Sequence, residues 1–174
     1  RVSLSDDGSR AAMSSHLNDN DRGHVRVFEY QTASSLWMQL GGTIRGEAEG
    51  DLSGWSLSLS GSGERVAIGA QANSAGGTGA GHVRVFEYAA ETGLWDQLGS
   101  DLDGEAAEDL SGISVSLSRD GSRVAIGAPL NDGGGVDAGH IRVFQLPWHP
   151  TSVPTGEPSG EPSSHPTLTP TASP

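Results

Sequence analysis

The sequence of 174 residues contains no cysteine, has only 5% aromatic residues and carries few positive charges. Without cysteine the chain has neither a disulfide framework nor a thiolate metal site. Only 10 Lys and Arg stand against 22 Asp and Glu, which gives a formal net charge of −12 at pH 7. Because nucleic-acid binding needs a basic face, this balance argues against it. No window of about 20 apolar residues occurs, so we expect no transmembrane segment.

The N-terminus lacks both a methionine and an apolar leader, so no signal peptide is visible. Residues 2–5 align with residues 115–118 of a later repeat copy. We therefore expect the chain to begin inside a first strand, as the truncated part of a longer array.

Glycine, by contrast, is abundant, with 26 residues, and the sequence repeats internally. Together with Ser, Thr and Val, glycine favours short strands and tight turns over helices. The motif Gly-His-Val-Arg-Val-Phe occurs at residues 23–28 and 81–86, and a variant with Ile occurs at residues 139–144. The copies are 58 residues apart. This period identifies a tandem repeat.

Each repeat predicts four antiparallel strands. In the second copy the alternating residues 56–60 predict the first strand, and the apolar residues 65–70 predict the second. Residues 61–63 supply a glycine-containing hairpin turn between them. Residues 82–88 and 94–98 predict the third and fourth strands.

Four strands per repeat are typical of a β-propeller blade. A single sheet cannot bury both of its faces, and the third strand carries bulky groups on both, so neighbouring blades are expected to stack on it. The sequence therefore predicts an all-β fold of propeller blades, in an incomplete ring of about 2.5–3 blades. The repeat region is residues 1–146, and the blades are expected at about 1–40, 53–98 and 111–146.

Residues 111–118, 124–129 and 139–144 together resemble the FG-GAP repeat. Ser111-Gly112 stands where that family has Phe-Gly, and residues 127–129 are a literal Gly-Ala-Pro. The resemblance implies a propeller like the head of integrin α subunits, in an extracellular adhesion protein. The family's calcium loop lies between its first two strands. Here the turn at residues 118–122 is too short and too poor in carboxylates to hold calcium there.

The third copy lacks the sequence of a fourth strand, and 2.5 blades cannot close a ring, for which about four is the minimum. Two explanations are open. Further blades lie upstream in a longer protein, which we favour, or copies of the chain associate to complete the ring.

Residues 147–174 differ from the rest of the chain and hold eight of its nine prolines, among Ser, Thr and Gly. Such a segment buries too little apolar surface to fold, so we expect a disordered tail. Its composition suits an O-glycosylated stalk and an extracellular or cell-surface location, although an unmodified linker is the alternative.

The loops between the second and third strands contain the candidate metal ligands. Asn and Asp side chains are oxygen donors for calcium, but they are also common turn formers. The second copy has no carboxylate in this loop, so calcium binding is not a property of every blade. The candidates lie in the first and third copies: Asn18, Asp19, Asp21, Asn131, Asp132 and Asp137.

Other polar residues favour structural roles. Because His24, His82 and His140 occupy equivalent positions, we expect them to stabilise the blades. The acidic connector at residues 101–109 is expected to be a solvated turn between blades, although its alternating acids also suit calcium. No catalytic motif occurs in the sequence, and no cofactor is expected beyond possible calcium.

The predicted function is a non-enzymatic extracellular scaffold for adhesion or ligand binding, with a protein or glycan ligand on its loops. A carbohydrate-associated or cell-wall structural protein is the first alternative, since exposed Trp37 or Trp95 would stack on sugars. A fragment of a propeller enzyme is the second.

Overall fold

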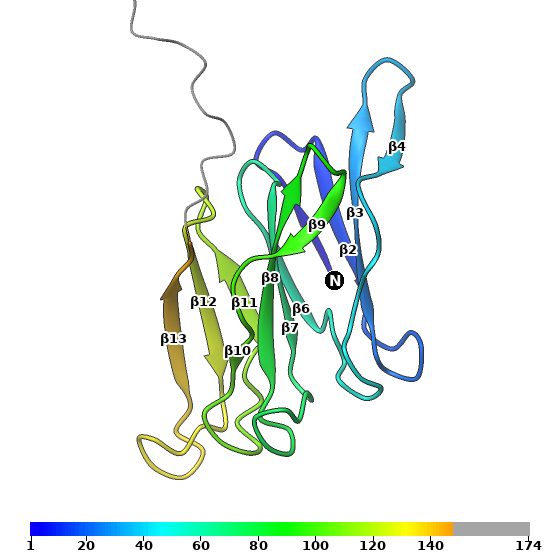
Figure 1. Ribbon diagram of the computed structural model, residues 1–174. Helices are drawn as coiled ribbons and strands as arrows, with labels where there is room; N and C mark the ends of the chain where they lie inside the picture. Colours follow the sequence, from blue (N-terminus) through cyan, green and yellow to red (C-terminus); the bar gives the residue numbers. More distant parts are fainter. Residues whose placement is uncertain (148–174) are drawn as a thin grey trace, which may run out of the picture.

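The computed structural model describes residues 1–147, and these form thirteen β-strands and no helix (Figure 1). The predicted tail lies outside the described residues, apart from Pro147. The strands are β1 (Val2–Leu4), β2 (Arg10–Ser15), β3 (His24–Gln31), β4 (Leu36–Gln39), β5 (Ile44–Arg45), β6 (Ser56–Leu59), β7 (Arg65–Ala70), β8 (His82–Ala89), β9 (Leu94–Gln97), β10 (Leu102–Asp103), β11 (Ser114–Leu117), β12 (Arg123–Ala128) and β13 (His140–Gln145).

The strands form three antiparallel sheets, one per repeat copy, and this confirms the predicted all-β fold class. The first blade has the order β1-β2-β3-β4, and β5 pairs with the other end of β3. Since β2 occupies one edge of β3, β4 and β5 share the opposite edge and together make the fourth strand. The second blade repeats this pattern with β6 to β10, and the third blade comprises β11-β12-β13.

The strand registers are the same in the three blades. Arg10 pairs with Glu29 in the first blade, and Arg65 pairs with Glu87 in the second. The hairpin between the first two strands turns at a glycine with φ of +69° in each blade, at Gly8, Gly63 and Gly121. A left-handed backbone of this kind favours glycine, as expected for these turns.

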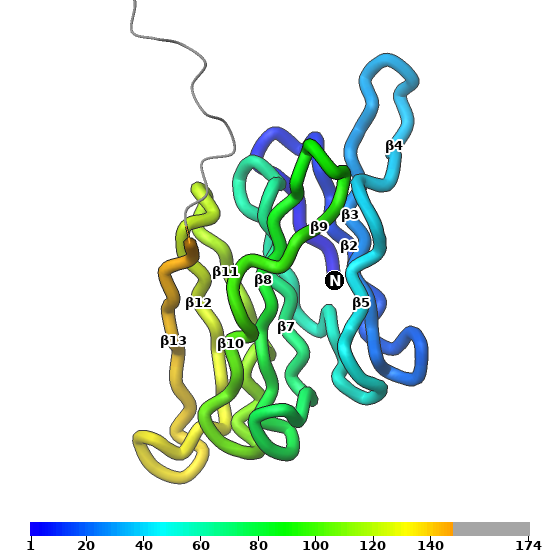
Figure 2. Tube along the Cα trace, viewed as in Figure 1, coloured from blue at the N-terminus to red at the C-terminus, as the bar shows by residue number. Residues whose placement is uncertain are grey.

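The blades stand side by side in chain order, with the first at the right of Figure 2 and the third at the left. One apolar cluster lies between the first and second blades and includes Val25, Ile68 and Phe86. A second cluster lies between the second and third blades and includes Val83 and Ile126. The second blade is therefore covered on both faces, as the apolar run of its second strand and the bulky groups on both faces of its third strand predicted.

The outer faces of the first and third blades are open. Leu4 is 58% exposed, although the equivalent Leu59 of the second blade is 6% exposed. On the other side Ile141 is 74% exposed, although the equivalent Val83 is fully buried. Each open face thus carries the side chains that a neighbouring blade covers elsewhere in the same molecule. Residues 1–147 contain no long apolar helix that would cross a membrane.

Candidate functional site

One end of the molecule gathers the loops between second and third strands and the connectors between blades, at the bottom of Figure 1. The two kinds of segment bond to each other through the backbone. The amide of Leu52 donates to the carbonyl of Asp21 at 2.8 Å in the first blade, and the amide of Glu108 donates to that of Thr78 at 2.8 Å in the second. This loop end is the candidate functional site, because exposed loops on a rigid frame commonly carry function.

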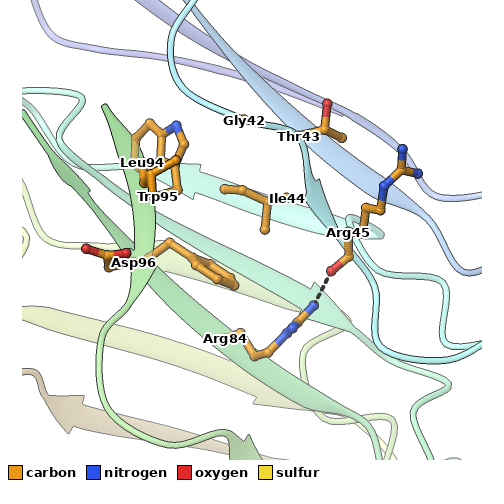
Figure 3. Close-up of a pocket in the computed structure, with 9 residues that line it drawn as sticks. Gly42, Thr43, Ile44, Arg45, Arg84, Leu94, Trp95 and Asp96 are labelled. Carbon is orange, nitrogen blue, oxygen red and sulfur yellow. Dashed lines mark hydrogen bonds between the residues drawn. The ribbon is translucent and has the colours of Figure 1, made fainter. Parts of the chain in front are cut away.

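The arginine of the repeated motif joins each blade to the one before it. Nη2 of Arg84 donates to the carbonyl of Arg45 at 2.7 Å, and Figure 3 shows this bond across the seam. Arg142 donates in the same way to the carbonyl of Asp103. Arg26 of the first blade is exposed. It holds the equivalent position on the open face.

A buried Asn–Asp bond fixes each connector to the following blade. Nδ2 of Asn73 donates to Oδ2 of Asp51 at 3.1 Å, and Nδ2 of Asn131 donates to Oδ2 of Asp109 at 2.8 Å. Both carboxylates also accept an amide of their own turn. All four residues are at most 5% exposed. Asn and Asp, which are common in binding loops, thus join one blade to the next here.

A pocket of about 330 Å³ lies at the seam between the first and second blades (Figure 3). Nε1 of Trp95 donates to the carbonyl of Leu40 at 2.8 Å. The backbone of Gly41 lies so close that a Cβ there would be 2.8 Å from Cδ1 of Trp95, at a φ of +69°. Trp95 is thus engaged in blade packing, whereas the equivalent Trp37 is 44% exposed on the open face.

The six predicted calcium ligands form two separate sets, in blades divided by the second blade. In the first blade, Asn18 Oδ1 lies 3.1 Å from Nδ1 of His24, and Asp19 forms an ion pair with Arg22 at 3.5 Å. Asp19 and Asp21 have φ of 59° and 61°. Such left-handed conformations suit Asp in turns.

In the third blade the predicted ligands mainly hold their own loop. Oδ1 of Asn131 accepts the amide of Gly133 at 2.9 Å. Oδ1 of Asp132 accepts the amide of Asp137 at 2.8 Å. Calcium binding in these two loops stays a prediction.

The sequence considerations missed one cluster, in which Glu47, Asp101 and Asp103 surround the buried His82. Its signal is present in the repeat alignment. The histidine recurs in every copy, whereas the first copy has Thr43 and Arg45 in place of Asp101 and Asp103. Because Asp101 and Asp103 are not repeated in the first copy although the histidine is, they indicate a feature that the first blade does not share.

No model of a known protein family matches the chain, and no curated protein matches it. The resemblance to FG-GAP repeats therefore gains no support from these comparisons. Solved structures do match, at low sequence identity.

A Bacteroides fragilis protein, described as a "putative 6-phosphogluconolactonase", is 15% identical with a TM-score of 0.54, covering 83% of this chain and 34% of that one. Hydrazine synthase of Kuenenia stuttgartiensis matches at 14% identity and a TM-score of 0.48, covering 83% of this chain and 44% of that one. TolB from Acinetobacter baumannii matches at 13% identity and a TM-score of 0.41, covering 83% and 32%.

The chain thus spans less than half the length of each of these structures. Similarity at this level of identity concerns the fold alone. The match with a TM-score of 0.54, together with the three antiparallel sheets, shows that the chain has a β-propeller type of fold.

Proposed function

We propose that this chain is part of a non-enzymatic propeller scaffold that binds a protein or glycan ligand with its loop end, outside the cell. One observation carries the proposal: the polar residues that repeat are used between blades, whereas the loop tips that do not repeat are exposed. Arg84 and Arg142, and likewise Asn73 and Asn131, make the same bonds in successive blades. Because these repeated bonds hold the blades together, the sequence of the loop tips can vary from blade to blade.

The loop tips differ in length, charge and conformation. The tip of the first blade contains three successive left-handed residues, Asp19 to Asp21. The equivalent loop of the second blade is neutral, with Ser74 and Thr78. That of the third blade carries Val136, which is 88% exposed. Variable loops on a rigid frame are a common arrangement for ligand recognition.

The extracellular setting rests on the composition of residues 147–174, and kinship with FG-GAP adhesion proteins rests on the sequence motifs. Both are parts of the proposal. The activities named for two of the similar structures are not carried over to this chain, because a shared fold does not imply a shared activity.

The open blade faces support further blades of the same repeat as partners. In the second blade, Arg84 and Trp95 donate to carbonyls of the preceding blade. Arg26 and Trp37 occupy the equivalent positions on the open face of the first blade. A further blade with the same outer-strand carbonyls would accept hydrogen bonds from both of these side chains.

A binding array tests the ligand proposal. The labelled chain is applied to an array of extracellular matrix proteins and glycans, beside a variant in which residues 19–21 and 132–137 are replaced by Gly and Ser at equal length. We expect the chain to bind at least one class of ligand. The variant should lose that binding and keep its circular-dichroism spectrum. Equal binding by the variant, or no binding by the unmodified chain, would contradict the proposal.

A further inference from the structure

The ring of His82 is buried between the first two blades and has an unused nitrogen. The residue is 1% exposed, and its Nδ1 atom has no hydrogen-bond partner. A buried polar atom without a partner is costly and is rare in folded proteins. An explanation is therefore needed for this nitrogen.

Three carboxylates face that nitrogen. Nδ1 of His82 lies 3.8 Å from Oε2 of Glu47, 3.9 Å from Oδ2 of Asp101 and 4.0 Å from Oδ1 of Asp103. These distances are too long for hydrogen bonds. The donor atoms of Glu47, His82 and Asp101 all lie within 4.8 Å of one another.

The fold brings these residues together from three segments. His82 opens β8 and pairs in register with Asp103 of β10. Asp101 lies just before β10 on the outer edge of the same blade. Glu47 comes from the connector that leaves the first blade. The cluster thus joins two blades at the loop end.

Ligands of one metal ion have this spacing. Two ligands about 2.1 Å from a tetrahedral zinc ion are about 3.4 Å apart, so small side-chain rotations would bring these donors to bonding distance. The three carboxylates and the guanidinium of Arg84, whose Nη1 is 3.6 Å from Oε1 of Glu47, carry a net charge of −2 beside a neutral imidazole. A divalent cation balances that charge.

The protonation state of the His82 imidazole is compatible with metal binding. Burial, and next the charge of Arg84, lowers the pKa of His82 below its usual 6.5 against the opposing effect of the nearby carboxylates. The ring is therefore neutral near pH 7, and neutral imidazole is the form that binds metals.

The other two blades lack the full set. In the first blade, Thr43 and Arg45 replace the two aspartates, and His24 is already paired with Asn18 at 3.1 Å. In the third blade, Glu105 lies 3.5 Å from Nδ1 of His140, and residues 1–147 supply no second carboxylate within 4.0 Å. The cluster is thus specific to the second blade.

We propose that Glu47, His82 and Asp101 bind a divalent transition-metal ion of the zinc type at the seam between the first two blades. Mixed nitrogen and carboxylate donors favour zinc, whereas calcium prefers oxygen donors alone. Three protein ligands leave a fourth position open to water or to a carboxylate of a ligand. This site is distinct from the loop residues predicted to bind calcium, and it does not depend on the proposed ligand-binding function.

Titration with zinc chloride tests the site. The chelator-treated chain is titrated by calorimetry, and we expect one tightly bound zinc ion per chain. Asp101→Thr introduces the residue that the first blade has at this partly exposed position, so we expect the variant to fold. Thermal melting without metal checks its folding. The substitution should weaken binding by about tenfold or more, since even residues behind metal ligands change affinity by about 10–100-fold. The matched control Glu105→Gln, at the position equivalent to Glu47, should bind like the unmodified chain.

Cobalt provides a second readout. Co²⁺ in the same site should give visible absorption bands of a four-coordinate ion, and Asp101→Thr should remove them. Two results would overturn the proposal. One is zinc binding no stronger than millimolar. The other is unchanged binding in Asp101→Thr, which would assign the metal to other histidines of the chain.

Discussion

Arg65 shows how one residue is used differently from blade to blade. It is 6% exposed, and its guanidinium contacts Oε1 of Glu87 at 2.8 Å. Nη1 also donates to the carbonyl of Gly121 in the hairpin of the third blade, at 2.9 Å. Arg123 is its equivalent in the third blade and is exposed. Burial by the next blade is therefore the main difference between the two arginines.

Replacing Arg65 by alanine should lower the free energy of unfolding by about 2–4 kcal/mol, since a buried charged hydrogen-bond network is broken. Arg123→Ala should lower it by less than about 0.5 kcal/mol, as is usual for surface substitutions. Urea unfolding of both variants measures the difference. A similar loss in free energy of unfolding for the two variants would show that the contacts of Arg65 across the seam add little to stability.

The hairpin between the first two strands has an aspartate directly before its turn glycine in two of the three blades. Hydrogen bonds from Ser9 and Ser5 lower the pKa of Asp7 from 3.8 to about 2, and bonds from Ser118 and Ser122 do the same for Asp120. The second blade has Ser62 at the equivalent position. The position before the turn glycine is thus acidic in two blades and uncharged in one.

The depressed pKa values predict a loss of stability in acid. The unfolded carboxyls titrate near 3.8 and the folded ones near 2. Their stabilising effect is therefore complete above about pH 4 and is lost as the pH falls through about 2. The double variant Asp7→Ser and Asp120→Ser should lose less stability between about pH 4 and pH 2 than the unmodified chain. Urea unfolding at the two pH values checks this, and an equal loss would show that the hairpin bonds do not shift these carboxyls.

The elements could be predicted well from the sequence because their signals are local. Alternation at Ser56–Ser60 and turn glycines such as Gly121 determine strands and hairpins within a few residues. The fourth strand is interrupted in the same way at Gly41 and at Gly99, both with positive φ. The two-residue strands β5 and β10 beyond these glycines could not be predicted, because they are too short to show an alternation of their own.

The candidate site was less predictable, since its contacts cross between blades. Asn131 has the residue type of a calcium ligand, but its amide bonds to Asp109 of the preceding connector. The cluster at His82 needs Glu47 and Asp101, which are 35 residues before it and 19 after it. Only the stacking of blades makes these residues neighbours. Composition and spacing along the chain do not contain that information.

At the scale of the whole molecule, the array behaves as a short stack in which each blade is stabilised by its neighbours. All six residues of β7 are buried, whereas only three of the six residues of the equivalent β12 are buried and every second residue of β13 is exposed. The second blade has two neighbours and the outer blades have one. We therefore expect the outer blades to open more readily than the second.

Hydrogen exchange measured by mass spectrometry tests this order together with the open faces. In dilute solution β7 and β8 should be the most protected strands, and β1 and β13 the least.

Each copy of the chain carries both open faces, so at high concentration one copy offers its third blade to the first blade of another. Protection of β1, β2 and β13 should then rise, and light scattering should give a mass above the 17.9 kDa of one chain. Ile141→Asp should abolish both changes, because it places a charge where a blade would pack, while the protection of β7 stays high. A monomer at every concentration would contradict docking of further blades on these faces.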